Sequence, residues 1–258
     1  MTLCLSCGKA VEYKPTVASL FSVCEQPQFC DECIGKFCFI SQKDACRGCG
    51  RDLLRLDRRF HDGKLCRDCR RWESRLPLPL FHGNMAVLTY NEPLKTIIAD
   101  LKFRGDAAII EGFGRDWQSA YRRLRGLCPA CLRYVLPPWV MKNDAWLIVP
   151  IPLSTVRLEQ RRFNQADLLA DMLPAEKVEA LLHVSPSPDR QSMRNREQRM
   201  ENMSRLFILQ TGAAAKLTGR RLLIVDDIYT TGATIRAAAA RLSTAGPLVI
   251  RSLTLIHG

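Results

Sequence analysis

The sequence predicts an α/β protein with a doubly wound, mainly parallel sheet, preceded by a cysteine-rich zinc-binding module. Two observations carry this prediction. Apolar, strand-like runs alternate with helical segments over residues 76–258. Four Cys-x-x-Cys pairs fall within the first 75 residues, where long-range apolar periodicity is weak. We therefore expect a zinc-binding module at residues 1–75 and a sheet domain at residues 76–258.

Each element of the sheet domain follows from its local pattern. The prolines of residues 75–80 form an extended linker. Short apolar runs predict strands, and apolar residues at i, i+3, i+4 and i+7 predict helices. Strands are expected at 85–90, 145–150, 178–184, 222–225 and 248–256, and helices at 92–103, 106–125 and 163–173. A last helix follows residue 234, with Ile235, Ala238, Ala239 and Leu242 on its apolar face and Gly246-Pro247 ending it.

Composition limits the class of protein. The 258 residues are 47% hydrophobic and 25% charged, as in a soluble globular protein. No run approaches the ~18 consecutive apolar residues of a membrane span, and residues 1–7 lack the features of a signal peptide. We expect a cytoplasmic protein. The formal net charge is +12, and two Zn²⁺ ions on eight thiolates would lower it to about +8. A basic chain suits polyanionic partners.

The cysteine spacing indicates metal binding. Thiolates two residues apart can hold one ion, and in an intracellular chain this spacing favours metal over disulfides. The alternative is a secreted disulfide framework. Four pairs supply the ligands of two tetrahedral Cys₄ zinc sites, assembled either sequentially or interleaved: Cys4, Cys7, Cys30, Cys33, Cys46, Cys49, Cys66 and Cys69. Cys24 and Cys38 read as buried apolar residues, and the distant pair Cys128/Cys131 as structural.

Residues 222–234 carry the main candidate site. An apolar strand, 222–225, is followed by the adjacent carboxylates Asp226 and Asp227 and then by a hydroxyl-rich loop that opens an Ala-rich helix. Backbone N–H groups and the helix dipole favour a phosphate at such a loop. The combination suits a ligand with both a sugar diol and a 5′-phosphate. The alternative is an ordinary strand-to-helix connection.

The segment 225–234 resembles the phosphoribosyl pyrophosphate (PRPP) loop of type I phosphoribosyltransferases. The resemblance implies that Asp226 and Asp227 hold the ribose hydroxyls and stabilise a cationic, oxocarbenium-like centre during catalysis. It also implies that the turn binds the 5′-phosphate, through Thr230, Thr231, Gly232, Ala233 and Thr234. Mg²⁺ would accompany PRPP, because hard cations prefer phosphate and carboxylate oxygen.

A second strand end supplies basic residues. The apolar strand ends in a proline-rich turn at 150–154, and Arg157, Arg161 and Arg162 follow. Backbone N–H groups and guanidinium forks could cradle a pyrophosphate there. Arg157 and Arg161 have the better claim, and the alternative is a solvated basic helix start.

The segments 149–153, 161–166 and 101–106, with Gln191, Arg199, Asn202 and the multi-cysteine N-terminus, resemble the ComF family of competence proteins over nearly the whole chain. The resemblance implies that Pro152, Leu153 and Ser154 form the pyrophosphate loop and that Lys102 reaches the site. One departure is Arg162, where the family usually has glycine. The arginine-rich segment 189–205 reads equally as a lid over phosphate or as an exposed charged helix.

Two functional hypotheses follow. By resemblance, the chain acts in natural transformation (DNA uptake), binding PRPP, single-stranded DNA and a competence helicase. Basic residues of the zinc-binding module accompany the aromatic residues Phe60 and Trp72, as single-strand binding would need. The alternative is an active phosphoribosyltransferase with an acceptor that the sequence does not identify. A third hypothesis, an adaptor that has lost ligand binding, is disfavoured by the intact acidic pair.

Overall fold

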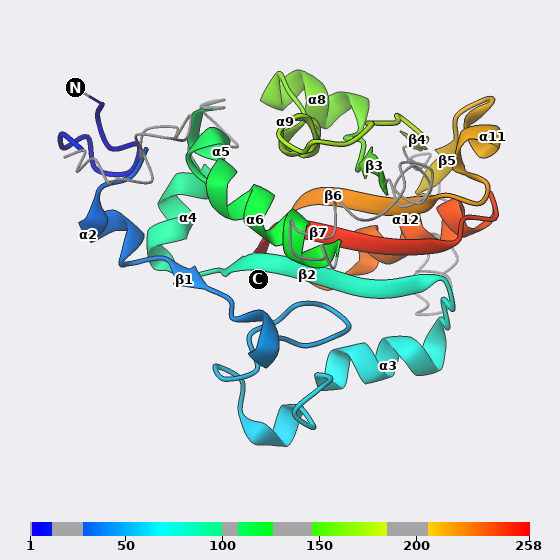
Figure 1. Cartoon of the computed structure of the whole chain (residues 1–258), viewed down its shortest axis with the longest axis horizontal. Coiled ribbons are helices and arrows are strands. Elements are labelled where there is room, and N and C mark those ends of the chain that lie inside the picture. Colours follow the sequence, from blue (N-terminus) through cyan, green and yellow to red (C-terminus); the bar gives the residue numbers. More distant parts are fainter. Residues whose placement is uncertain (1, 12–27, 100–107, 126–145, 185–205) are drawn as a thin grey trace, which may run out of the picture.

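The computed structural model describes residues 2–11, 28–99, 108–125, 146–184 and 206–258. Its centre is a five-stranded sheet in the order β1-β2-β7-β6-β3 (Figure 1). The strands are β1 (Cys38–Phe39), β2 (Phe81–Thr89), β3 (Trp146–Pro150), β6 (Arg221–Tyr229) and β7 (Val249–His257). All neighbours are parallel except β1, which runs antiparallel to β2. The predicted fold class is confirmed.

Helices cover both faces of the sheet, because apolar side chains of the inner strands alternate between the faces. In β6, Leu223 and Val225 pack into one core cluster, while Leu222 and Ile224 pack into another. The first cluster includes residues of α4 (Glu92–Ala99), α5 (Ala108–Gly112), α6 (Gly114–Leu124) and α9 (Gln165–Asp171). The second includes residues of α11 (Ala213–Leu217) and α12 (Ala233–Ser243).

The remaining elements are short. A separate antiparallel pair joins β4 (Leu181–His183) to β5 (Phe207–Leu209). The N-terminal segment contains α2 (Asp31–Ile34), the 3-10 helices η1 (Gln42–Asp44) and η2 (Arg58–Phe60), and α3 (Arg67–Arg75). The helix α8 (Thr155–Arg161) follows β3. Within the described ranges, every helix is too short or too polar to span a lipid bilayer.

The cysteine-rich segment is joined closely to the sheet. β1 extends the sheet at its β2 edge, and the turn around Gly48 lies against β2, where a Cβ on Gly83 would come within 2.2 Å of the Arg47 carbonyl oxygen. Buried Asn84 of β2 donates to the Cys49 carbonyl oxygen at 2.9 Å and accepts from Ser252 Oγ at 2.8 Å. These contacts cross residue 75, where the division into two domains stays a prediction.

The predicted helix boundaries differ from the observed ones in two places. The helix expected over 163–173 is observed as α9. A second helix, α8, precedes it and was not predicted. Arg162, in a left-handed conformation, ends α8 and separates the two helices. The helix expected over 106–125 is interrupted at Phe113, between α5 and α6. The strands β1 and β5 were also not predicted, because two or three residues carry no detectable periodicity.

Candidate functional site

The candidate site lies at the carboxyl ends of the neighbouring strands β3 and β6, where β6 extends further than β3. The pairing of β3 with β6 stops at Pro150 opposite Val225, whereas β6 continues beside β7 as far as Tyr229 opposite His257. The chain leaves the sheet after Ile151, whose N–H donates to the Val225 carbonyl oxygen at 3.0 Å. The β3-side edge of residues 226–229 is therefore open. This is the carboxyl end of a parallel sheet, where α/β proteins bind ligands.

A cavity of about 590 Å³ occupies this open edge. It is lined by nine of the predicted site residues: Pro152, Leu153, Ser154, Arg157, Arg161, Asp226, Asp227, Thr230 and Thr234. Thr231, Gly232 and Ala233 belong to the adjoining loop and helix start but do not line the cavity. Lys102 lies outside the described residues, as do Cys24, the pair Cys128/Cys131 and the segment 189–205. The two halves of the site, 70 residues apart in the sequence, thus form one pocket.

The acidic pair is arranged to accept hydrogen bonds. The Asp227 N–H donates to Asp226 Oδ1 at 2.9 Å, which fixes one carboxylate against the backbone. Asp227 Oδ2 is buried and has no hydrogen-bond partner among the described residues. A buried carboxylate oxygen without a donor is costly. A ligand hydroxyl in the cavity would satisfy it.

The loop after β6 depends on a glycine. Gly232 has φ 78°, and a Cβ there would lie 2.0 Å from the Tyr229 hydroxyl. Thr230, Thr231 and Thr234 remain exposed around this turn. The Ala233 N–H meets Thr231 Oγ1 at 3.4 Å, at the start of the 11-residue helix α12. The remaining backbone N–H groups of this first turn and the helix dipole favour an anion.

The helix α8 carries the two arginines that line the cavity, Arg157 and Arg161. Ser154 caps this helix, because its Oγ accepts the Arg157 N–H at 3.4 Å. Arg161 Nη1 donates to Gln165 Oε1 at 3.1 Å. The cavity therefore has cations on one wall and carboxylates on another, as a ligand with both phosphates and hydroxyls would require.

Two aromatic lining residues were missed by the sequence analysis. His183 of β4 and Phe207 of β5 line the cavity, and their rings meet edge to face with centroids 5.7 Å apart. Burial, and then the nearby positive charge of Arg157, lowers the pKa of His183. No local pattern indicates this part of the cavity, because β4 and β5 meet only through tertiary pairing across more than 20 intervening residues.

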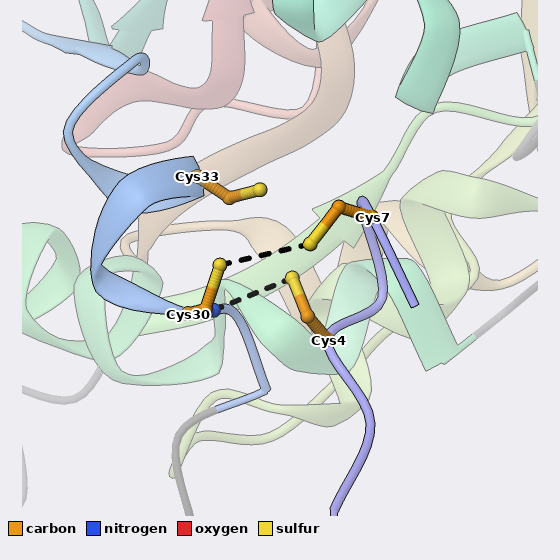
Figure 2. Close-up of side chains that lie close together, drawn as sticks. All are labelled: Cys4, Cys7, Cys30 and Cys33. Carbon is orange, nitrogen blue, oxygen red and sulfur yellow. Dashed lines mark hydrogen bonds between the residues drawn. The ribbon is translucent and has the colours of Figure 1, made fainter. Parts of the chain in front are cut away.

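The first cysteine cluster joins the N-terminal turn to α2. Figure 2 shows the sulfur atoms of Cys4, Cys7, Cys30 and Cys33 turned toward a common centre. Cys7 and Cys30 Sγ are 3.7 Å apart, and the Cys30 N–H donates to Cys4 Sγ at 3.3 Å. Burial alone would raise the pKa of Cys4, but backbone N–H groups, led by that of Cys30, lower it to about 6.

The second cluster is fully buried and consists of Cys46, Cys49, Cys66 and Cys69. The Sγ atoms are 3.7 Å apart in both the Cys46–Cys69 and the Cys49–Cys66 pair. Hydrogen bonds from the other three thiols, chiefly Cys49, lower the pKa of Cys46. That shift favours the thiolate, which is the metal-binding form.

Both clusters fit a tetrahedral metal ion. Four sulfurs at the usual ~2.3 Å from zinc are ~3.8 Å from one another, close to the observed 3.7 Å. All nine described cysteines are free of disulfides. The structure also decides the pairing that the spacing left open. The assembly is sequential, with the first pair joining the second and the third joining the fourth.

The fold is that of a phosphoribosyltransferase-like protein. Residues 174–258 match the phosphoribosyl transferase domain family. Over 99% of its length the chain is 31% identical to competence protein ComFC of Bacillus subtilis (strain 168), covering 95% of that protein. It is 26% identical, over 98% of its length, to competence protein ComFC of Streptococcus pneumoniae (strain ATCC BAA-255 / R6), covering 99% of it. The chain belongs to the ComF family, in its ComFC-type branch.

Proposed function

We propose that this chain is a competence protein that binds PRPP, or a closely related phosphoribosyl ligand, in the cavity at the carboxyl ends of β3 and β6. One observation carries the proposal, namely that a single 590 Å³ pocket is lined by the acidic pair, by Thr230 and Thr234 of the threonine loop and by two arginines. The names of both relatives support the role in competence.

Each wall of the cavity has a separate task in this proposal. The Asp226 and Asp227 carboxylates accept hydrogen bonds from the ribose 2- and 3-hydroxyls. The turn that ends at Thr234 donates backbone N–H groups to the 5′-phosphate. Arg157 and Arg161 neutralise the pyrophosphate as paired guanidinium donors.

The donor set also fits Mg²⁺, since carboxylate and phosphate oxygens are its preferred ligands. Asp226 and Asp227 would hold it together with the ligand's own oxygens. The ion supplies charge neutralisation of the pyrophosphate. The two tetrathiolate sites, by contrast, fit Zn²⁺.

Calorimetric titration of the full-length protein with PRPP and Mg²⁺ tests ligand binding. We expect saturable binding by the natural protein and at least a tenfold weaker affinity in Asp226→Asn/Asp227→Asn. The matched control is Asp171→Asn, since Asp171 pairs with Lys177 outside the cavity. Absence of saturable binding by the natural protein at millimolar PRPP would refute the proposal.

Single-stranded DNA is the second proposed ligand, bound by the cysteine-rich segment. Arg58 and the 42%-exposed Phe60 lie together on η2 and offer a cation beside a stacking ring. We expect Arg58→Ala/Phe60→Ala to weaken binding of an oligonucleotide in fluorescence anisotropy, while Asp171→Asn leaves it unchanged. Equal affinities would remove this segment from the proposal. The competence helicase stays a predicted partner.

The aromatic wall favours one alternative, an active phosphoribosyltransferase. His183 and Phe207 stand in the same cavity as the acidic pair and could receive an acceptor beside the anomeric carbon. Attack by that acceptor would form a bond to the anomeric carbon and expel pyrophosphate. Pyrophosphate release in the presence of candidate acceptors, abolished in Asp226→Asn/Asp227→Asn, would support the enzyme. Saturable PRPP binding without release would support a sensor or scaffold.

A further inference from the structure

The helix α3 connects the second cysteine cluster to the phosphate loop. Cys66 is the N-cap of α3 and Cys69 lies in its first turn. One turn further, the Trp72 indole Nε1–H donates to the carbonyl oxygen of Thr231 at 2.9 Å. A side chain only three residues from a metal ligand thus contacts the loop proposed to bind the 5′-phosphate.

Arg236 strengthens this connection from the side of α12. Its guanidinium lies over the Trp72 ring, 5.1 Å from the centroid, and 5.6 Å from the centroid of Phe81. The residue is only 4% exposed, so these cation–π contacts are largely shielded from water. Trp72 is therefore held by two contacts. One is with the backbone of the loop at Thr231, and the other is with Arg236 near the start of α12.

Tyr229 forms a second connection beneath the same loop. It is 3% exposed and belongs to the core cluster that contains all four cysteines of the second site. Its hydroxyl fills the space where a side chain on Gly232 would otherwise lie. Its ring stacks on His257, with centroids 5.2 Å apart. The loop therefore rests on the second cluster and its immediate neighbours.

The first cysteine cluster, unlike the second, does not lie next to the phosphate loop. Its residues Cys4 and Cys33 pack in the other core cluster, with Phe29, Phe37 and Phe113. Figure 1 places α2 beside α4 and α5, at the opposite end of the molecule from β4 and β5. Among the described residues, no hydrogen bond joins this cluster to residues 227–236.

We infer that the second cysteine cluster positions the phosphate loop through Trp72, and that the first cluster does not. The two clusters have the same ligands but different consequences for the site. Trp72 is a positioning residue in this account, since it holds the backbone of Thr231 and touches no ligand. The expected effect on PRPP affinity rests on the proposed function, but the effect on loop order does not.

Amide hydrogen exchange of the full-length, zinc-loaded protein tests the role of Trp72. Trp72→Phe removes the indole donor and keeps an aromatic ring beneath Arg236. Loss of one hydrogen bond corresponds to about a fivefold change, so we expect exchange in residues 231–238 to accelerate about fivefold. Ser74→Ala, on the same helix, is the matched control. Unchanged exchange at 231–238 in Trp72→Phe would overturn the inference.

Removal of the clusters one at a time tests the difference between them. Cys66→Ser/Cys69→Ser and Cys4→Ser/Cys7→Ser should each lower the zinc content by one ion per chain, measured by elemental analysis. Faster exchange at 231–238 is expected in the former alone, and equal effects would refute the inference. If Cys66→Ser/Cys69→Ser does not fold, the exchange at 231–238 in Trp72→Phe tests the inference instead.

PRPP titration separates failure of this inference from failure of the proposed function. With PRPP and Mg²⁺, Trp72→Phe should bind about fivefold more weakly than the natural protein, whereas Ser74→Ala should bind equally. If the natural protein binds no PRPP, the proposed function fails, and the exchange data still test the coupling. If PRPP binds equally to the natural protein and Trp72→Phe, the coupling to the ligand is wrong and the proposed function stands.

Discussion

Arg162 is the single non-glycine residue with a positive φ in the described part of the chain, at 66°. Its side chain is exposed, so the left-handed conformation serves the backbone, which turns there from α8 into α9. The ComF resemblance places a glycine at this position, and the observed φ explains why glycine suits it. The replacement of the family's glycine by Arg162 therefore strains the backbone locally, and it does not remove a contact from the cavity.

Arg162→Gly should stabilise the protein slightly. Removal of the left-handed strain gains ~1–2 kcal/mol, while the freer unfolded chain of a glycine variant costs ~0.4–1 kcal/mol. We expect a net gain of about 0.5–1 kcal/mol in the free energy of unfolding, measured by urea denaturation. Arg162→Ala keeps the strain and should show no gain. A glycine variant less stable than the alanine variant would contradict this explanation.

His257 makes stability depend on pH. Burial, followed by the charge of Arg51, lowers its pKa from 6.5 to about 4. Below pH 6.5 the unfolded chain takes up a proton that the folded chain refuses, so stability is lost as the pH falls from 6.5 toward 4. Between pH 7 and 5 the natural protein should lose about 2 kcal/mol more than His257→Phe. If both proteins lose the same free energy of unfolding between pH 7 and pH 5, His257 does not contribute.

The acidic pair could be predicted from the sequence, because a strand, two carboxylates and a loop stand together within thirteen residues. His183 and Phe207 could not, since the two residues come together only when β4 pairs with β5. Local patterns thus located the acidic pair, two threonines of the loop and the arginines that line the cavity. They did not reveal the remaining wall of the cavity.

At the scale of elements, the cysteine turn at 46–50 packs on the sheet at β2 and β7, where a helix would otherwise cover these strands. The sequence predicted the ligands, but the sheet face that they cover follows from packing. Three hydrogen bonds of the Asn84 side chain fix this packing. Asn84 Nδ2 donates to both the Cys49 carbonyl oxygen and Thr254 Oγ1, and Asn84 Oδ1 accepts from Ser252.

Asn84→Ala should loosen the second cysteine cluster. The change would leave the buried Ser252 hydroxyl and Cys49 carbonyl without their partner, at a cost of about 2–4 kcal/mol. We expect a lower urea midpoint and faster transfer of zinc to a chelator. Asn91→Ala is a control, because Asn91 bonds the Lys36 carbonyl oxygen in a more exposed position. Equal zinc release from Asn84→Ala and the natural protein would contradict this role.

Across the whole molecule, the net charge of +12 overstates the positive charge available to DNA. Five of the eight arginines in residues 47–71 form ion pairs with Asp52, Asp57, Asp62 or Asp68. Arg47, Arg58 and Arg67 form none with the described residues. The side chain of Trp72 is also engaged by Thr231 and Arg236. Of the two aromatic residues named from the sequence, Phe60 is the more open, since its ring is 42% exposed with the Arg59 guanidinium 6.0 Å from its centroid.

The salt dependence of single-stranded DNA binding should therefore be shallow. Three phosphate contacts at about 0.7 per contact give a slope of about −2 for log affinity against log salt. The slope is measured by anisotropy titrations from low to moderate salt. A slope of about −5 or steeper would show that the paired arginines, or basic residues outside this segment, contact DNA.

The unequal lengths of β3 and β6 have a consequence for adaptation. The cavity exists because the paired strands β3 and β6 end at different residues, and not because small side chains leave space inside the core. The residues that line the cavity can therefore change one at a time, toward different ligands, while the sheet beneath them keeps its architecture.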